Sequence, residues 1–188
     1  TDASVYQIKP IGVVLPKDTN DVLNLMEYSQ KNSIPLLARG GGSSQCGQTV
    51  GESIVLDYSR HQNKILEVNL EEKYVWVEPG VVLDHLNAQL KPHGLWFPVD
   101  VSTSSRATIG GMSANNSCGS RSLYYGNMVH NVLAIETILD DGSLSTFDHI
   151  DKNFLSTKND QDKLYKIINK FFDVRKNVSS ELNEHWPT

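Results

Sequence analysis

The most informative stretch of the sequence is Ala38-Arg39-Gly40-Gly41-Gly42-Ser43-Ser44-Gln45-Cys46-Gly47. Successive glycines leave their backbone N–H groups unshielded, so such a loop can curl around an anion. The hydroxyls of Ser43 and Ser44 add donors, and Arg39 adds positive charge unless it pairs with a neighbouring carboxylate. This chemistry favours phosphate or pyrophosphate. The alternative is an ordinary flexible surface turn, because glycine and serine are common in loops.

The loop departs from two widespread phosphate-binding motifs. No Gly-Lys-Ser/Thr follows it, as a Walker loop requires, and Gln45 stands where G-x-G-x-x-G needs its third glycine. The sequence therefore favours an anion loop of another kind.

Short strands and helices surround the loop. The expected helices are Thr19–Lys31, Val82–Leu90 and Asp160–Asn177, each with apolar residues at helical spacing. The expected strands are Gly12–Leu15, Ile34–Ala38, Ile54–Tyr58, Ile65–Asn69, Tyr74–Glu78, a β-rich run over Val129–Leu139, and Ser143–Phe147. The first two strands and the helix between them form a small βαβ-like unit, and the later strands form two hairpins. The pattern predicts an α+β fold.

A second segment, Pro98–Gly119, is rich in small residues and has few large apolar ones. We expect it to line a channel in which a long, flat ligand lies against backbone, rather than to fill a core. Ala107, Gly110, Gly111 and Ala114 recur at spacings of three and four, so a helix here would present a bare face. The alternative is a close contact between two helices, which also needs small residues.

Composition excludes several classes of protein. The formal net charge is −5 with scattered charges, which argues against nucleic acid as a partner. Two cysteines are too few for a disulfide framework, a zinc site or an iron–sulfur site, and we expect no metal. No apolar run approaches the ~20 residues of a membrane helix. The chain begins Thr1-Asp2-Ala3 without methionine, and we expect it to be a piece of a longer protein.

Four motifs together resemble a known family. They are Arg39–Ser44, Glu78-Pro79-Gly80, Ala107–Gly111 with Asn115–Gly119, and Tyr125-Gly126-Asn127. In this order they resemble the FAD-binding domain of the vanillyl-alcohol oxidase / para-cresol methylhydroxylase superfamily, nearest its D-lactate, glycolate and D-2-hydroxyglutarate dehydrogenase branch. Leu90–Gly94 followed by Ser102–Thr108 is similar to large bacterial members that carry an iron–sulfur domain. The resemblance spans roughly Val5 to Phe147.

The resemblance implies a fold of two α+β subdomains with FAD between them. Residues 1–70 would form the N-terminal subdomain with the pyrophosphate loop, and residues 71–150 the second. Residues 151–188 would be a helical segment leading to an absent substrate domain. Implied FAD-binding residues are Arg39, Gly40, Gly41, Gly42, Ser43, Ser44 and Gly47 at the pyrophosphate, Pro79 and Gly80 along the cofactor, Asp100 to Thr108 near the flavin or ribityl chain, Gly110, Gly111, Ser117, Cys118 and Gly119 in the pocket, and Ile135 at the adenine.

The chain departs from the family at a few positions. Ser43 replaces the usual threonine and keeps the hydroxyl, and Cys118 replaces the first of two glycines, which would tighten the site. Some members attach flavin through a histidine beside the glycines, but none of the six histidines lies there, so we expect dissociable FAD. For Cys46 we expect a buried inert thiol rather than a reactive one. We expect the histidines to be surface or hydrogen-bonded residues.

The implied function is the FAD-binding domain of a dehydrogenase that oxidises a D-lactate-like 2-hydroxy acid by hydride transfer to flavin N5. Electrons would pass to a quinone, cytochrome, flavoprotein or iron–sulfur partner. No catalytic residue is expected in this chain, which alone should bind FAD without turnover. A cytoplasmic location, or one peripheral to the inner membrane for the full-length protein, is expected. The alternatives are an FAD oxidase or reductase with another substrate, and a non-redox nucleotide- or phosphate-binding module.

Overall fold

The computed structural model describes residues 1–150, 154 and 162–186, and the following statements concern those residues. Contacts divide the chain into two compact units. Unit 1 comprises residues 1–132 and 140–142, and unit 2 comprises residues 133–139 and 143–188. Each unit is described by itself.

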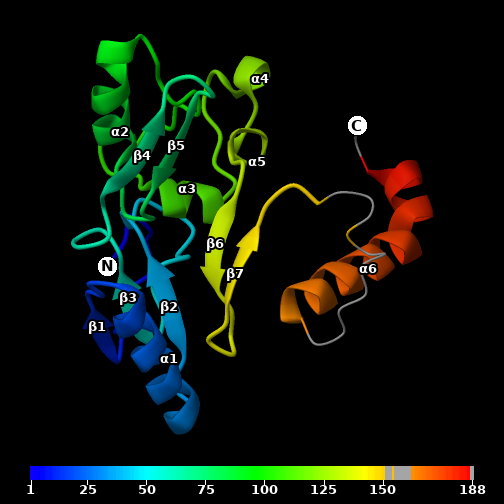
Figure 1. Ribbon diagram of the computed structural model, residues 1–188. Coiled ribbons are helices and arrows are strands. Elements are labelled where there is room, and N and C mark those ends of the chain that lie inside the picture. The colour runs from blue at the N-terminus through cyan, green and yellow to red at the C-terminus, as the bar shows by residue number, and fades with distance from the viewer. Residues whose placement is uncertain (151–153, 155–161, 187–188) are drawn as a thin grey trace. The chain divides into compact units, whose positions relative to one another are not determined.

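Unit 1 begins with a parallel sheet. Its strands are β1 (Gly12–Val14), β2 (Leu36–Arg39) and β3 (Ile54–Asp57), in the order β1-β3-β2. The helix α1 (Thr19–Asn32) connects β1 to β2 (Figure 1). The first three residues of β3 are each less than one-tenth exposed, as expected of the central strand in a sheet covered on both faces. The expected βαβ-like unit is present, with β3 inserted between its two strands.

Both ends of α1 follow capping rules. The Asp18 carboxylate accepts a hydrogen bond from the Asp21 N–H at 3.1 Å, which satisfies one of the helix's free donors. The helix ends at Ser33, whose φ of 53° is left-handed, so its N–H can bond back to the last turn. The expected helix Thr19–Lys31 is correct within one residue.

A hairpin and a helix form the next layer of unit 1. The strands β4 (Ile65–Asn69) and β5 (Tyr74–Val77) pair antiparallel, and α2 (Leu83–Leu90) continues into the 3-10 turn η1 (Lys91–His93). The α2 residues Leu86 and Leu90 are buried against apolar residues of both strands. The expected boundary at residue 70 falls in the turn between the paired strands, and the subdomain division stays a prediction.

The small-residue segment contributes to the core, contrary to expectation. Val99 is 0% exposed and Met112 is 2% exposed, and they pack with Leu83, Ala107 and Met128. The few large side chains in this segment thus point inward, and its many small ones allow the backbone to approach them closely. The expectation that Pro98–Gly119 would not fill a core was wrong.

Three short helices occupy residues 109–131: α3 (Ile109–Ala114), α4 (Ser122–Tyr125) and α5 (Met128–Asn131). The expected β-rich run over Val129–Leu139 is therefore wrong in its first half. Asn127 and His130 form a reciprocal capping box, in which His130 Nδ1 accepts the Asn127 N–H at 3.1 Å. This side-chain bond starts a helical turn in a stretch whose residues favour strands.

Unit 2 contains the antiparallel hairpin of β6 (Ile135–Ile138) and β7 (Leu144–Phe147), and the helix α6 (Lys163–His185). The hairpin agrees with the expected strands. The helix extends beyond the expected end at Asn177, and the expected start at Asp160 lies outside the described residues. No helix in the described part of the chain is long and apolar enough to cross a membrane.

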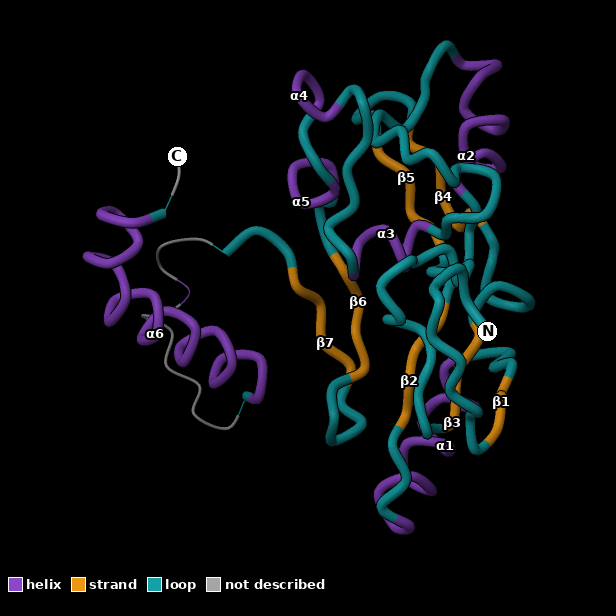
Figure 2. The backbone as a smooth tube through the Cα atoms, turned by 180° about the vertical axis from the view of Figure 1, so that it is seen from behind, coloured by secondary structure: helices purple, strands orange, loops and turns teal. Residues whose placement is uncertain are grey.

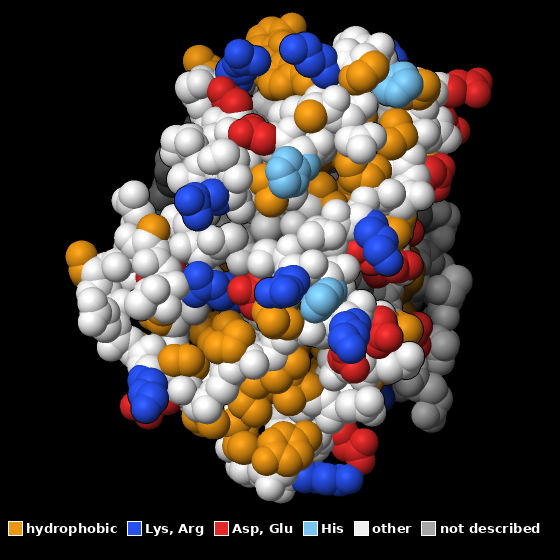
Figure 3. All heavy atoms as spheres, turned by 90° about the vertical axis from the view of Figure 1, so that its left-hand side faces the viewer, with side chains coloured by type: hydrophobic (Ala, Val, Ile, Leu, Met, Phe, Trp, Pro, Cys, Tyr) orange, Lys and Arg blue, Asp and Glu red, His pale blue; other side chains and the backbone are white. Residues whose placement is uncertain are grey.

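Apolar side chains remain exposed on one face of unit 1. In Figure 3 hydrophobic atoms gather on the lower part of the face that contains the N-terminal segment and β1. Val5, Ile11 and Val13 are 89%, 60% and 58% exposed. β1 is an edge strand of its sheet, so this edge is open both in its hydrogen bonds and in its packing.

The core of unit 1 predicts a large effect of truncation at Leu86, which is 0% exposed. Leu86→Ala should lower the free energy of unfolding by about 2–5 kcal/mol, because the lost side chain leaves a cavity. Urea denaturation checks this value. The matched control Leu66→Ala, at a leucine that is 53% exposed, should change stability by less than about 1 kcal/mol. Equal effects of the two substitutions would contradict the assignment of the core.

Candidate functional site

The glycine loop leaves the sheet at the end of β2. Arg39 is paired in register with Asp57, and its Nε lies 4.0 Å from Asp57 Oδ2. Both side chains are only about one-fifth exposed. The Arg39 guanidinium also lies over the α-carbon of Gly42, whose φ of +63° suits glycine. Of the two roles open to Arg39, the structure shows pairing with a carboxylate.

The first two glycines of the loop touch the second small-residue segment. A β-carbon on Gly41 would overlap the carbonyl oxygen of Arg106, and one on Gly40 would overlap Thr108 Oγ1. Only glycine permits this approach of two backbones. The structure therefore brings together two segments that are more than sixty residues apart in the sequence.

The loop retains hydrogen-bond donors that the protein does not use. Within the described residues, the backbone N–H groups of Gly41, Gly42 and Ser43 donate to no protein acceptor, and all three residues are half-buried. Half-buried backbone N–H groups that have no protein acceptor and lie next to one another in a glycine loop are suited to an anion. The loop therefore fits a pyrophosphate group.

Pro79 and Gly80 also contact the second small-residue segment, and the two together form a wall beside the loop. The Gly110 N–H donates to the Pro79 carbonyl at 2.9 Å, and the Gly80 N–H donates to the Gln62 carbonyl at 2.7 Å. A β-carbon on Gly110 would lie 2.6 Å from Pro79 Cβ, so these two segments also approach through glycine. Thr108 is 1% exposed and accepts the Gly111 N–H at 3.3 Å, which fixes the start of α3 beside the loop.

The other end of the small-residue segment is organised by Asp100. Its carboxylate accepts the Arg121 N–H at 3.0 Å and the Ser120 hydroxyl at 2.7 Å. These bonds, with the nearby Arg121 charge, hold the pKa of Asp100 below its ordinary value. A β-carbon on Gly119 would overlap the Asp100 backbone. Asp100, Ser117, Cys118 and Gly119 thus lie in one stretch of wall, where Cys118 is exposed.

A polar link that the sequence did not predict joins the loop to this wall. Ser44 Oγ donates to Gln48 Oε1 at 2.6 Å, and Gln48 Nε2 donates to Asn115 Oδ1 at 3.1 Å. Asn115 Nδ2 in turn lies 3.3 Å from Ser117 Oγ. Asn115 stands in a motif noted from the sequence, whereas nothing in the sequence distinguishes Gln48 from other polar loop residues.

Three residues noted from the sequence lie outside the contacts between the loop and the wall. Gly47 has a φ of +73° and lies against the ring of Tyr6. Ile135 begins β6 in unit 2, which is described by itself. Cys46 is exposed, so the expectation of a buried thiol was wrong. The FAD contacts expected of individual residues stay predictions.

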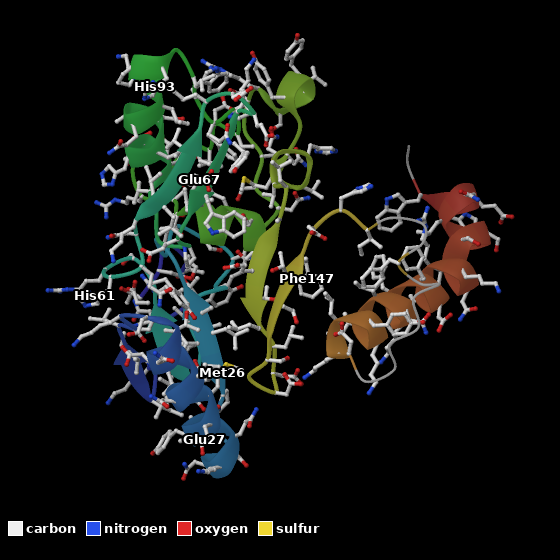
Figure 4. The ribbon with its side chains drawn as sticks, in the orientation of Figure 1. Met26, Glu27, His61, Glu67, His93 and Phe147 are labelled. Atoms are coloured by element: carbon white, nitrogen blue, oxygen red, sulfur yellow. The ribbon has the colours of Figure 1, made fainter. Side chains whose placement is uncertain are left out.

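Neither the histidines of unit 1 nor a surface hollow is part of the glycine loop. His61 and His93 are at the periphery of unit 1, and Glu67 is on the exposed side of β4 (Figure 4). A shallow hollow between β4 and α2 is lined by Lys64, Glu67, His85 and Gln89, and it shares no residue with the glycine wall. Among the described residues, no group of histidine, cysteine and carboxylate side chains could hold a metal ion.

Comparisons with known proteins agree with this geometry. Residues 10–148 match the family of the FAD binding domain. The D-2-hydroxyglutarate dehydrogenase of Haemophilus influenzae is 44% identical over 150 residues, which cover 77% of this chain and 14% of the relative. The mitochondrial D-lactate dehydrogenase [cytochrome] of Kluyveromyces lactis is 36% identical over 140 residues, covering 72% of this chain and 24% of the relative. The chain thus spans between about one-seventh and one-quarter of the length of these relatives.

A solved structure shows the same fold. The 6-hydroxy-D-nicotine oxidase of Arthrobacter nicotinovorans superposes with a TM-score of 0.69 at 17% identity, over 82% of this chain and 33% of the oxidase. The expected α+β flavoprotein fold is confirmed. The family match places the chain in the class of dinucleotide-binding proteins. More particularly, the chain belongs to the FAD-binding domain family, and FAD is its cofactor.

The contact between Gly41 and Arg106 gives a prediction for cofactor binding. Gly41→Ala should weaken FAD binding about tenfold or more, the equivalent of at least about 1.4 kcal/mol, because the added methyl group forces the loop away from the wall. Titration of flavin fluorescence measures the dissociation constant. Gly12→Ala is the matched control, since a β-carbon there meets nothing within 4 Å. Unchanged FAD affinity in Gly41→Ala would contradict the position of the loop.

The lowered pKa of Asp100 predicts a pH dependence of stability. A carboxylate whose pKa is lower in the folded state contributes stability above its ordinary pKa of 3.8, and this contribution is lost as the pH falls through the lowered value. The difference in unfolding free energy between wild type and Asp100→Asn should therefore shrink as the pH falls below 3.8. Urea denaturation across that range checks this, and a constant difference would be the contrary result.

Proposed function

We propose that this chain is the FAD-binding part of a flavin-dependent dehydrogenase that oxidises a 2-hydroxy acid. The observation that carries the proposal is the contact of the glycine loop with residues 106–108, together with the N–H groups of Gly41, Gly42 and Ser43, which donate to no acceptor in the described part of the protein. Two relatives support the reaction class, since one is named a D-2-hydroxyglutarate dehydrogenase and the other a D-lactate dehydrogenase.

The residues of this chain bind and position rather than react. The N–H groups of Gly41, Gly42 and Ser43 would hold the pyrophosphate, with the Ser43 and Ser44 hydroxyls beside them. Gly80, Thr108 and Gly110 would form the wall along the cofactor. The chemistry that bound FAD supplies is acceptance of a hydride at flavin N5. No histidine lies in the loop, which supports a dissociable cofactor.

The choice of acid and of electron acceptor is a finer proposal. The proposed substrate class is the D-2-hydroxy acids. D-2-hydroxyglutarate is the first candidate, because a D-2-hydroxyglutarate dehydrogenase is 44% identical to this chain. The electron acceptor would be a quinone, a cytochrome or an iron–sulfur centre, and the name of one relative includes a cytochrome. We place the full-length protein in the cytoplasm or peripheral to the inner membrane.

Two alternatives are separated by simple measurements. An FAD oxidase or reductase with another substrate would bind the same cofactor but would not oxidise hydroxy acids. A phosphate- or nucleotide-binding module without redox chemistry would bind ADP or pyrophosphate as well as FAD and would show no flavin absorbance after purification. The family match favours the flavoprotein.

The proposal predicts a two-part result. The purified chain mixed with FAD should quench flavin fluorescence and show a raised melting temperature, because a ligand that binds only the folded state stabilises it. The full-length protein with FAD and an artificial electron acceptor should oxidise D-2-hydroxyglutarate or D-lactate but not their L-enantiomers. The chain alone should oxidise neither. Absence of quenching and of a thermal shift would refute FAD binding, and an inactive, FAD-loaded full-length protein would refute the substrate class.

A further inference from the structure

Arg121 is held from three sides although its side chain is 59% exposed. Its guanidinium lies over the ring of Trp96, with 4.9 Å between the Arg121 Cζ and the ring centroid. Its Nε lies 3.7 Å from Asp100 Oδ2, and its backbone N–H donates to Asp100 Oδ1 at 3.0 Å. Tyr125 packs edge-on against Trp96 at 5.2 Å between centroids, so the stacking partner is itself fixed.

This arrangement differs from an ordinary ion pair at the surface. Exposed pairs contribute little, because two long side chains lose rotamer freedom to form one contact. Here the Trp96 ring and the Asp100 carboxylate both contact the guanidinium and orient it, while the backbone bond to Asp100 holds the main chain of Arg121. The ion pair with Asp100 is made on the Nε side of the guanidinium, and within the described residues the Nη groups of Arg121 donate no hydrogen bond to a protein acceptor. The forked end of an oriented arginine is therefore left available.

The location of Arg121 connects it to the cofactor wall. Asp100 contacts Arg121 on one side and the backbone of Gly119 on the other. The small-residue wall thus runs from Thr108, beside Gly40, to Gly119, beside Asp100. Figures 1 and 2 both show α3 between the end of β2 and α4, the helix that Arg121 precedes. Arg121 therefore stands at the Gly119 end of the wall, directly before α4.

We propose that Arg121 binds a carboxylate of the 2-hydroxy acid substrate through its two Nη groups. This inference rests on the proposed function, since it assigns one residue of the same site to the substrate. A planar guanidinium matches a carboxylate with two parallel hydrogen bonds, which a lysine cannot reproduce. Asp100 holds the Nε side and Trp96 holds the plane, so little freedom is lost when the carboxylate binds. Arg121 is a substrate-binding residue contributed by the FAD-binding domain.

The test uses the full-length protein loaded with FAD and three variants. Arg121→Met removes the charge and the fork, Arg121→Lys keeps the charge alone, and Arg175→Met removes an exposed arginine of α6 as the matched control. KM and kcat are measured with D-2-hydroxyglutarate and D-lactate, and the dissociation constant of FAD is measured for each variant. Arg121→Met should raise KM about tenfold or more with the more active acid and change kcat by less than about threefold. Arg121→Lys should fall between Arg121→Met and wild type, and Arg175→Met should equal wild type.

The outcomes separate this inference from the proposed function. If the wild-type protein oxidises neither acid, the proposed function fails and the inference fails with it. If the wild type is active and Arg121→Met keeps its KM, the inference alone is overturned. It is also overturned if the FAD dissociation constant rises as much as KM, since Arg121 would then hold the cofactor. If Arg121→Met does not fold, Arg121→Lys decides: a raised KM with unchanged FAD affinity supports the inference, and an unchanged KM refutes it.

Discussion

The close approach of the glycine loop to the backbone of residues 106–108 is the constraint on which the rest of unit 1 depends. Gly40 and Gly41 have no side chains to hold the two segments apart, so Thr108 Oγ1 and the Arg106 carbonyl occupy the space that β-carbons would need. This contact fixes the end of the parallel sheet against the second layer. Without it, the loop after β2 would be a surface turn, which is the alternative that the sequence alone leaves open.

Thr108 has three roles at this junction. It is buried, it caps α3 through the Gly111 N–H, and its hydroxyl fills the space beside Gly40. Its neighbours add backbone bonds, since the Leu83 N–H donates to the Ala107 carbonyl and the Ile109 N–H donates to the Val81 carbonyl. The start of α2, the start of α3 and the loop are thereby joined at Thr108 and its two neighbours. A threonine side chain can serve all three roles at once, because its methyl group can pack against neighbours while its hydroxyl oxygen accepts a hydrogen bond.

Many of the helices, strands and turns could be predicted from the sequence, because the patterns that indicate them are local. The apolar run of β3, the Asp18 cap and the β4–β5 turn each depend on residues within a few positions, and so does the glycine loop after β2; its binding of an anion stays a prediction. The errors concern tertiary context. The core positions of Val99 and Met112 depend on which face of an irregular segment turns inward, and no periodicity shows this. The strand-favouring residues of α5 are overruled by the bond between Asn127 and His130. The Gln48–Asn115 bond and the stacking of Arg121 on Trp96 join residues too far apart for any local pattern.

Backbone N–H groups and charged side chains have different roles at the glycine loop and at Arg121. Arg39, the cation nearest the glycines, is paired with Asp57, so the loop must bind its anion chiefly through backbone dipoles. These dipoles are fixed by the fold and cost no side-chain entropy, which suits a cofactor that stays bound. At the other end, Arg121 is oriented by an aromatic ring and a carboxylate that contacts only its Nε side. In the function proposed above, this guanidinium would bind a small acid that leaves in each cycle, and partial neutralisation by Asp100 would limit how tightly the acid is held. The two proposed anion sites would thus rest on backbone N–H groups and on a single oriented guanidinium, in a chain with a net charge of −5.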